Sequence, residues 1–400
     1  MRPVDVVIPV YKGLDETRRC IESVLAARQA IETRVVVVDD ATPEPAIARH
    51  LDELAQSGRV TLLRNDANLG FVRSVNRGMD NAAGRDVVLL NSDTEVANDW
   101  LDRMRAAAYR DERIATVTPF SNNATICSYP FEGWEGRIPG TLGLARLDQL
   151  FASVNAQKMV DLPTAVGFCM FIRRDALEAL GTFDAERFGR GYGEENDFCM
   201  RAWKAGWRNV LAADVFVFHQ GSVSFSGERD ALAQAAGHAL IALHPEYPVK
   251  VHEFVRSDPA AQFRSAVDVA RVELGTEEAQ HVVAERLDER SRLVAGLWQI
   301  DQLAEMVRER QTAIGQLNRA LEHATHLVAD RDKILANERV LFEERAEEIA
   351  KLRAGLAYAE KLAFERADEL ERIHSSRLWR YYSFIVRRVM PRAGKAGSAP

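Results

Sequence analysis

Three acidic side chains gather in one short stretch, at Glu194, Glu195 and Asp197, directly after a glycine-rich loop. A helical pattern of apolar residues follows and stops at Gly206. Glycine permits tight loop conformations, and the amino end of a helix stabilises nearby carboxylates. A carboxylate held there can accept the proton of a substrate hydroxyl. An acidic first turn that only caps a helix has the same composition, so the interpretation depends on the residues upstream.

Polar side chains also follow two apolar runs near the start of the chain. Asp39 and Asp40 follow the run at 34–38, and Asn91-Ser92-Asp93 follows the run at 86–90. Further strands are predicted at 4–10 and 60–63, and helices at 14–27, from Pro45 and from 68 to 84. Continuous apolar strands that alternate with helices predict an α/β domain with a mostly parallel sheet covered on both faces. Ligands bind beyond the carboxyl ends of such strands, where these polar residues stand.

The alternation weakens beyond residue 116. Residues 120–160 are rich in glycine and proline and are predicted to form an irregular region that faces the substrate. Trp134 in this region is a candidate to contact a sugar or to position the loop. The remaining elements are expected as strands at 165–172, 210–212 and 215–218 and a helix at 175–180, with the domain ending near 227.

Composition limits the class of protein. The net charge of -7 gives no support for a protein that binds nucleic acid. The four cysteines are scattered, which indicates a reducing compartment where cysteine serves as a small hydrophobic residue. A strand pattern begins almost at residue 1 and leaves no room for a signal peptide. No apolar run approaches the roughly 20 residues of a membrane-spanning helix. We therefore expect a cytoplasmic protein.

The sequence changes character beyond about 275, after a predicted helical connector at 228–275. Glycine and proline become rare, and charges of both signs interleave. Apolar residues recur every seven positions at Leu293, Ile300, Val307, Ile314, Leu321, Val328, Leu335, Phe342, Ile349, Leu356, Ala363 and Leu370. This repeat predicts a coiled coil over 276–375 and self-association into a homo-oligomer. A single helix stabilised by charge pairs, or one folded back on itself, is the alternative.

The last segment, 376–400, is aromatic and basic. Its stretch from Leu378 to Met390 contains no acidic residue. This composition predicts a helix that lies in a membrane interface, with its rings at headgroup depth and its arginines on anionic lipid. The protein would then be peripheral at the inner face of the membrane. The alternative is a helix that packs on another subunit.

Several short motifs occur in one order between residue 4 and about residue 227. They are Val6-Val7-Ile8-Pro9-Val10-Tyr11, Val36-Val37-Val38-Asp39-Asp40-Ala41-Thr42, Asn68-Leu69-Gly70 with Asn76 and Gly78, Leu89-Leu90-Asn91-Ser92-Asp93-Thr94, Gly191 to Arg201, and His219-Gln220-Gly221-Ser222. In these motifs the chain resembles the family 2 inverting glycosyltransferases, particularly the rhamnosyltransferase-like members of bacterial surface polysaccharide assembly. The resemblance implies a GT-A fold and sugar transfer from a nucleotide-sugar donor to a saccharide or lipid-linked saccharide acceptor, with inversion.

The resemblance also implies a donor site at the strand ends. Pro9 and Tyr11 would line the pocket for the base, and Asp39 or Asp40 would accept hydrogen bonds from the base or the ribose. Asn68 and Gly70 would allow the backbone to approach the nucleotide closely, although a helix cap explains these two residues equally well.

A metal site is implied at the end of the 86–90 strand. A divalent ion neutralises the diphosphate of the donor and assists its departure. Asp93 is suited to hold Mg²⁺ or Mn²⁺ through oxygen. The family usually has Asp-x-Asp here, and Asn91 replaces the first carboxylate. His219 resembles the position that completes the metal site, where a neutral imidazole can be a ligand; a structural histidine is the alternative.

Glu195 aligns with the second carboxylate of the family's Glu-Asp pair, which serves as general base. It would take a proton from the acceptor hydroxyl in a single displacement. Glu194 and Asp197 are expected to position substrate or hold the loop. The rival hypothesis is an inactive scaffold of the same fold that acts through its coiled coil. Asn91 favours the scaffold, whereas the retained Asp93, Glu195 and His219 favour the enzyme.

Overall fold

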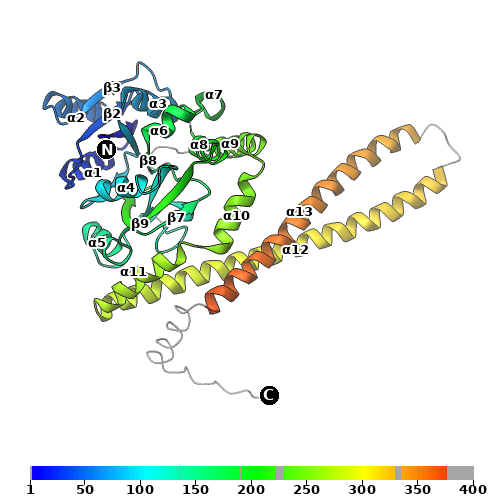
Figure 1. Ribbon diagram of the computed structural model, residues 1–400. Coiled ribbons are helices and arrows are strands. Elements are labelled where there is room, and N and C mark those ends of the chain that lie inside the picture. The colour runs from blue at the N-terminus through cyan, green and yellow to red at the C-terminus, as the bar shows by residue number, and fades with distance from the viewer. Residues whose placement is uncertain (1, 135, 190, 222–228, 329–334, 376–400) are drawn as a thin grey trace. The chain divides into compact units, whose positions relative to one another are not determined.

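The computed structural model describes residues 2–375 except 135, 190, 222–228 and 329–334 (Figure 1). The strands are β1 (Val4–Val10), β2 (Thr33–Asp39), β3 (Thr61–Arg64), β4 (Asp86–Leu90), β5 (Thr94–Glu95), β6 (Ile114–Ser121), β7 (Met159–Leu162), β8 (Cys169–Ile172) and β9 (Arg208–His219). The helices are α1 (Leu14–Ala26), α2 (Pro45–Gln56), α3 (Phe71–Asn81), α4 (Trp100–Ala108), the 3₁₀ turn η1 (Thr125–Cys127), α5 (Leu144–Val154), α6 (Arg174–Leu180), α7 (Ala185–Phe188), α8 (Glu194–Lys204), α9 (Arg229–Leu243), α10 (Tyr247–Ser257), α11 (Ala261–Glu273), α12 (Thr276–Val328) and α13 (Leu335–Ser375).

The strands form one sheet in the order β3-β2-β1-β4-β8-β6-β9-β5, with β7 also paired to β9. The first four strands in this order pair in parallel. Beyond β4 the sheet is mixed, because β8 pairs antiparallel with both β4 and β6. The predicted α/β class is confirmed, while the sheet is uniformly parallel only in its first half, since β6 and β9 pair in parallel beyond the antiparallel β8.

Alternating residues of β1 explain why both faces of the sheet are covered. Val4, Val6 and Ile8 belong to one buried apolar cluster, and Val7 belongs to another. Successive side chains of a strand point to opposite faces, so each face needs its own layer. The first cluster includes residues of α1, α2, α4 and α5, and the second includes residues of α3, α8 and α9.

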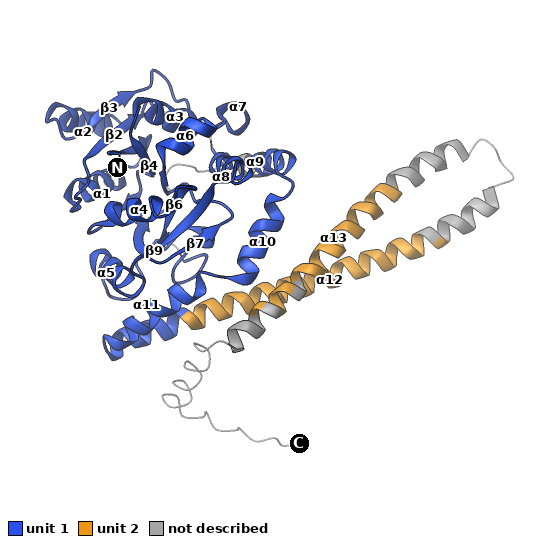
Figure 2. Ribbon diagram, in the orientation of Figure 1, with its two compact units in different colours: residues 1–285 blue, residues 286–400 orange. Residues whose placement is uncertain are grey.

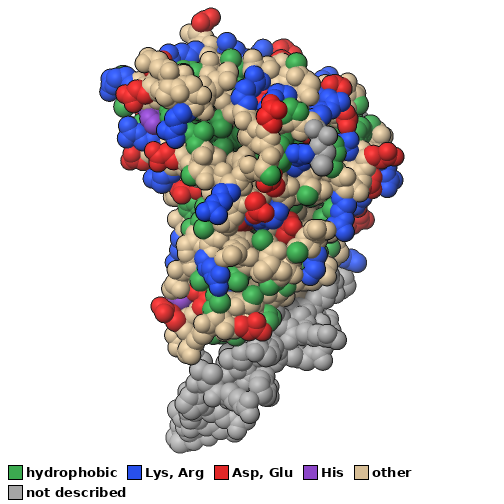
Figure 3. Space-filling model, turned by 60° about the vertical axis from the view of Figure 1, so that its left-hand side comes forward, with side chains coloured by type: hydrophobic (Ala, Val, Ile, Leu, Met, Phe, Trp, Pro, Cys, Tyr) green, Lys and Arg blue, Asp and Glu red, His purple; other side chains and the backbone are tan. Residues whose placement is uncertain are grey.

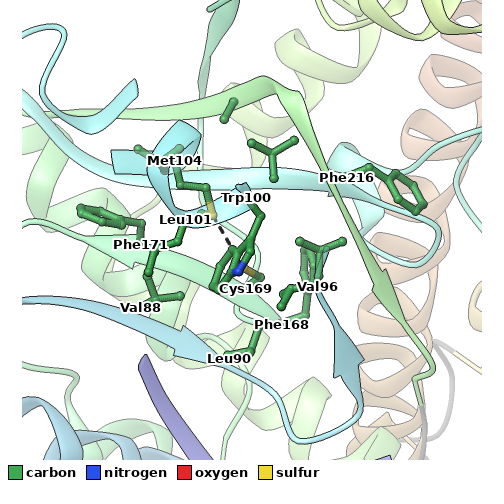
Figure 4. Packing of buried hydrophobic residues seen from close by; sticks show 14 of the residues in the cluster. Val88, Leu90, Val96, Trp100, Leu101, Met104, Phe168, Cys169, Phe171 and Phe216 are labelled. Carbon is green, nitrogen blue, oxygen red and sulfur yellow. Dashed lines mark hydrogen bonds between the residues drawn. The ribbon is translucent and has the colours of Figure 1, made fainter. Parts of the chain in front are cut away.

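The first cluster contains the completely buried Trp100 of α4 (Figure 4). Met104 and Cys169 lie beside it, with their sulfur atoms 4.0 Å apart. All four cysteines are buried and free. Burial raises the pKa of Cys20 to about 12, so this thiol stays protonated and unreactive. The cysteines serve as small hydrophobic residues, as the sequence predicted.

Three predicted features of the region after residue 116 were wrong. Helix α5 lies inside the segment expected to be irregular, because its buried Leu147, Leu150 and Phe151 follow helical spacing once the glycines and prolines end. The two strands predicted at 210–212 and 215–218 are one strand, β9. Its register against β6 shifts between Pro119 and Phe120, so the polar Asp214 occupies an irregularity within one strand. In addition, β8 covers only the second half of the expected 165–172 strand.

The chain divides into two compact units, residues 1–285 and 286–400 (Figure 2). The first unit extends well beyond residue 227, where the sequence places the end of the transferase domain. The segment at 229–273 contains the helices α9, α10 and α11. Its side chains complete the core: Leu240 belongs to one buried cluster, and Phe254 and Val267 belong to the other.

The second unit is built from the rest of α12 and from α13. Ile314 and Gly315 of α12 and Ile349 and Leu352 of α13 line one cavity of about 220 Å³, so the two helices pack on each other. This arrangement corresponds to the folded-back alternative. No helix within the described ranges is long and apolar enough to span a bilayer. The segment 376–400, for which an interfacial helix is predicted, lies outside the described residues.

Charged side chains of both signs are interspersed over the face shown in Figure 3. Lysine and arginine stand beside aspartate and glutamate, with apolar side chains between them. This mixture is typical of the solvent-exposed surface of a globular protein.

Candidate active site

The carboxyl ends of β1 and β2 are joined by backbone contacts. Pro9 pairs with Val38, and the amide of Asp40 donates to the carbonyl of Val10 at 2.9 Å. The Thr42 hydroxyl donates to the carbonyl of Tyr11 at 2.6 Å. The structure therefore brings together the four residues expected at the base pocket, namely Pro9, Tyr11, Asp39 and Asp40.

Asp40 holds the loop that leads into α3. Its Oδ1 accepts hydrogen bonds from the Asn65 side chain and the Leu69 amide, both at 2.8 Å. Its Oδ2 accepts from the Gly70 amide at 2.9 Å. Gly70 has φ 84°, a conformation that favours glycine, and its amide also lies 3.1 Å from Oδ1 of Asn68. Asp40, Asn68 and Gly70 thus shape the backbone at this strand end.

Asp39 is also buried and already has protein partners. The Thr42 amide donates to its Oδ1 at 2.9 Å, and Nε of Arg64 donates to its Oδ2 at 3.0 Å. A carboxylate offers about four acceptor positions. Asp39 therefore retains acceptor capacity that a bound base or ribose can use.

Asp93 and His219 lie next to each other where β4 and β9 end. Oδ1 of Asp93 is 3.4 Å from Nε2 of His219. The amides of Gln220 and Gly221 donate to the backbone oxygen and to Oδ2 of Asp93, each at 3.0 Å. The segment after β9 therefore fixes the Asp93 carboxylate.

The second ring nitrogen of His219 determines its tautomer. Nδ1 lies 2.7 Å from the carbonyl oxygen of Asn123, which can only accept, so Nδ1 carries the hydrogen. In the neutral ring Nε2 then presents its lone pair towards Asp93. Metal-binding histidines are oriented by such a bond from their other nitrogen. Two facing acceptors are favourable only with a proton or a cation between them.

These two side chains fit a divalent ion bound together with a substrate diphosphate. Adjacent ligands of Mg²⁺ lie about 3 Å apart when each bond is about 2.1 Å, which is close to the 3.4 Å separation of Oδ1 and Nε2. Among the described residues, no group of three or more His, Cys, Asp or Glu side chains is arranged to hold a metal. Mg²⁺ is commonly held by one or two protein ligands plus substrate phosphates and waters.

Glu194 and Glu195 begin α8, after Gly193 in the left-handed conformation. Oε2 of each is buried and has no hydrogen-bond partner in the described part of the chain. Burial raises the pKa of Glu194 well above its ordinary value, and the charge of Glu195 adds to the effect. Burial also raises the pKa of Glu195, against the lowering effect of nearby backbone amides. A carboxylate with a raised pKa is a better proton acceptor.

Phe168 connects Asp93 and His219 with Glu195. Its ring stacks on that of His219, with centroids 5.1 Å apart. Its carbonyl oxygen accepts from the Asn91 amide at 2.8 Å. A Cβ added at the preceding Gly167 would lie 3.8 Å from Cδ of Glu195. Asp93, His219 and Glu195 are therefore grouped around one short segment before β8.

Asp197 holds the surrounding structure together. Nε of Arg201 donates to its Oδ2 at 2.8 Å, and Nε2 of His244 lies 2.9 Å from its Oδ1. Arg201 also donates to the carbonyls of Leu180 and Thr182. Asp197 thus joins α8 to the end of α6 and to the end of α9, which supports the loop-holding role considered for it.

Trp134 is buried, at 5% exposure, within its own loop. Its indole nitrogen donates to the carbonyl of Arg137 at 3.1 Å, and the Arg137 guanidinium lies 4.0 Å from the ring centroid. Phe131 packs against it edge-on at 5.5 Å. The tryptophan thus stabilises the loop from 131 to 137.

Four contributors to the site were missed from the sequence: Asn122, Asn123, Phe168 and His244. The Asn122 side chain holds the end of β9. It accepts a hydrogen bond from the His219 amide and donates one to the His219 carbonyl, each at 2.8 Å. A polar Asn-Asn pair directly after an apolar run was the available signal for the first two. Phe168 and His244 carry no local signal, because their roles depend on distant partners.

An α/β sheet with acidic residues at its parallel strand ends and an acidic helix start beside them fits the GT-A fold that the sequence motifs predict. Residues 5–181 match the family model described as Glycosyl transferase family 2.

Individual relatives match parts of the chain. Polypeptide N-acetylgalactosaminyltransferase 4 of Caenorhabditis elegans is 25% identical over 217 residues, 52% of this chain and 36% of that protein. Succinoglycan biosynthesis protein ExoO of Rhizobium meliloti is 36% identical over 149 residues, 37% of this chain and 40% of that protein. The matches thus span less than half the length of these relatives. The crystal structure of GalNAc-T7 with UDP, GalNAc and Mn²⁺ is 17% identical, with a TM-score of 0.47 over 67% of this chain and 54% of that one.

Proposed function

We propose that the chain transfers a sugar from a nucleotide-sugar donor to a saccharide or lipid-linked saccharide acceptor, with inversion, in bacterial cell-surface polysaccharide assembly. One observation carries the proposal: Asp93 and His219 converge at the sheet edge, and Glu195 reaches the same segment. The similarity to a succinoglycan biosynthesis protein supports a polysaccharide acceptor.

The donor would bind across the ends of β1, β2 and β4. Pro9 and Tyr11 would line the base, and Asp39 would accept hydrogen bonds from the base or the ribose. Asp93 and His219 would hold Mg²⁺ or Mn²⁺, which neutralises diphosphate charge and makes the nucleoside diphosphate a better leaving group. Asn91, in place of a carboxylate, leaves these two side chains as the protein's ligands.

Glu195 would act as the general base. Its carboxylate takes the proton from the acceptor hydroxyl, and that oxygen forms a new bond to the anomeric carbon. The bond from that carbon to the diphosphate oxygen breaks on the opposite side, so the configuration inverts. Because burial raises the pKa of Glu195, the protonated form that results is stabilised after the transfer.

A donor screen with matched variants tests this proposal. Thermal unfolding of the full chain is followed with UDP-, GDP- and dTDP-sugars, with and without Mn²⁺, and transfer is assayed to saccharide acceptors and to a Ser/Thr peptide. The peptide is included because several relatives are named polypeptide N-acetylgalactosaminyltransferases. Glu195→Gln is expected to keep donor binding and to lose transfer by about 10²–10⁴-fold. Retained transfer would show that another residue is the base.

An inactive scaffold of the same fold is the second candidate, and Asn91 is the observation that favours it. The same screen separates the two candidates. Absence of binding and of transfer with every donor, in the wild type as in Glu195→Gln, would support the scaffold. Restoring the carboxylate in Asn91→Asp would then show whether this position alone limits metal binding.

We further propose that the protein is cytoplasmic, forms homo-oligomers through residues 276–375 and binds the inner face of the membrane through 376–400. The basic and aromatic composition of the last segment supports contact with anionic lipid. Deletion of 376–400 is expected to release the protein from anionic vesicles in a flotation assay. Equal binding with and without the segment would contradict this role.

A further inference from the structure

Arg271 of α11 is fully buried and joins α12 to a loop near the site. Its Nε donates to Oε1 of Glu278 at 2.7 Å, and its two terminal nitrogens donate to the carboxylate of Glu285 at 2.6 and 2.8 Å. Nη1 also donates to the Tyr129 hydroxyl at 2.9 Å, and that hydroxyl donates to Asp268 at 2.8 Å. We call these five residues the Arg271 network.

The network holds the loop from 129 to 141 at both ends. At the far end, Oε2 of Glu278 accepts from the Thr141 amide at 3.1 Å and from its hydroxyl at 2.9 Å. Burial would raise the pKa of Glu278, but hydrogen bonds from Thr141 and Arg271 hold this pKa below its ordinary value. At Gly140, a side chain would overlap both Glu278 and Arg271. The first turns of α12 are therefore packed tightly against this loop.

The same loop reaches Asp93 and His219, the proposed metal ligands. The Tyr129 amide donates to the Ser121 carbonyl at 2.8 Å, which closes a short backbone turn over residues 121–129. This turn contains Asn122, whose side chain bonds the backbone of His219, and Asn123, whose carbonyl fixes the tautomer of His219. Further along, a Cβ at Gly136 would lie 3.9 Å from the side chain of Gln220, next to His219.

We infer that Arg271 is a positioning residue: through Tyr129 it holds the 121–141 segment so that His219 presents Nε2 to Asp93, and the first turns of α12 complete this part of the site. The inference rests on the proposed role of His219 in holding the metal. It also makes α12, the first helix of the heptad region, part of the transferase site up to Glu285.

Energetics favour a positioning role over a stabilising one. A buried arginine with two carboxylates is expensive to desolvate, and well-packed apolar residues often give equal or greater stability. Such a network specifies one geometry, because every partner must meet the fork of the guanidinium. In this protein that geometry places Tyr129 and Thr141, the two ends of the loop.

The test compares Tyr129→Phe and Glu285→Gln with a matched control in the full chain. Tyr129→Phe removes only the hydroxyl that links the network to the loop. The control, Asp5→Asn, alters an equally buried carboxylate that pairs with Arg34 and Arg85 at the amino end of β1. Hydrogen exchange of each variant is measured by mass spectrometry. Mn²⁺ binding is measured by electron paramagnetic resonance, with UDP and GDP as probes.

In both network variants, amides of 122–141 should exchange about tenfold faster, while β1 to β4 stay unchanged. The dissociation constant for Mn²⁺ should rise about tenfold or more, in the range seen for residues that orient metal ligands. Asp5→Asn should change neither quantity. If Glu285→Gln does not fold, Tyr129→Phe decides. Exchange of 122–141 no faster than in Asp5→Asn would overturn the inference. If the wild type binds neither UDP nor GDP, the proposed function fails. The hydrogen-exchange result alone then decides whether the Arg271 network holds the 121–141 segment.

Discussion

At the scale of single residues, Glu194 is a buried carboxyl group whose Oε2 has no hydrogen-bond partner in the described part of the chain. Burial and the neighbouring Glu195 raise its pKa in the folded protein, so the folded state holds its proton more tightly than the unfolded chain does. Below the ordinary glutamate pKa the side chain is protonated in both the folded and the unfolded state, so its titration does not lower the stability of the protein. As the pH rises through that value towards the folded pKa, the unfolded state gains by releasing its proton, and the protein loses stability.

Glu194→Gln should therefore raise the melting temperature at pH 7, by about 2–4 °C for each kcal/mol recovered. The gain should shrink as the pH falls towards 4, where the wild-type side chain is protonated as well. Melting curves between pH 4 and 8 measure this difference. Glu253→Gln, at an exposed position of α10, controls for the loss of one negative charge. A gain that is equal at all pH values would indicate improved packing instead.

Residue roles could be predicted only where the family motifs carry them. Asp93 and His219 were named from the motifs, and the structure places them 3.4 Å apart. Asn123 and His244 could not be found, because each acts on a residue far along the chain, at His219 and Asp197. The sequence has no periodicity that reports such pairs. Asp39 or Asp40 was expected to accept hydrogen bonds from the base or the ribose, and the sequence did not show that Asp40 also accepts from the amides of Leu69 and Gly70.

At the scale of elements, α3 packs closely on β1 at Gly78. Gly78 allows this approach, since a Cβ there would overlap the side chain of Val7. Gly237 in α9 has open space around the same position. Gly78→Ala should destabilise the protein by about 1–3 kcal/mol through overpacking. Gly237→Ala should stabilise it by up to about 1 kcal/mol through helix propensity.

Chemical denaturation of the two variants measures these changes. The comparison is matched because the same substitution is made in two different helices. Opposite signs are expected because packing decides the result at Gly78 and backbone entropy decides it at Gly237. A stabilised Gly78→Ala would mean that α3 can move away from β1 without loss. The Gly78 motif position would then need a reason other than packing.

Elements were predictable where the apolar pattern is continuous. The strands β1, β2 and β4 are buried on both faces, so apolar residues dominate their sequences. The strand β9 was divided in two because Asp214 falls in its middle. That side chain accepts a hydrogen bond from the Gln157 amide at 2.8 Å, a partner that a sequence pattern cannot reveal. Local patterns thus predict regular elements better than irregularities within them.

At the scale of the whole molecule, the limit of the first unit could not be read from composition. Glycines mark the end of the strand-rich part near 227, yet later helices still supply core residues such as Leu240 and Phe263. The Arg271 network carries the unit into α12. The heptad repeat predicted long helices correctly, but a repeat of this kind specifies an apolar stripe and leaves the partner of that stripe open.

Packing of α12 on α13 leaves large apolar side chains of α12 uncovered. Trp298, Leu303 and Met306 are 63%, 53% and 51% exposed. Apolar surface of this kind on a helix marks a site of association, and the proposed homo-oligomer supplies a second copy of the chain as the partner.

Trp298→Lys should therefore lower the average mass in sedimentation equilibrium and leave the melting temperature of the first unit unchanged. Gln299→Lys adds the same charge one position along, on a different side of the helix, and should leave the mass unchanged. Equal masses for the wild type and Trp298→Lys at every concentration would exclude this face from self-association.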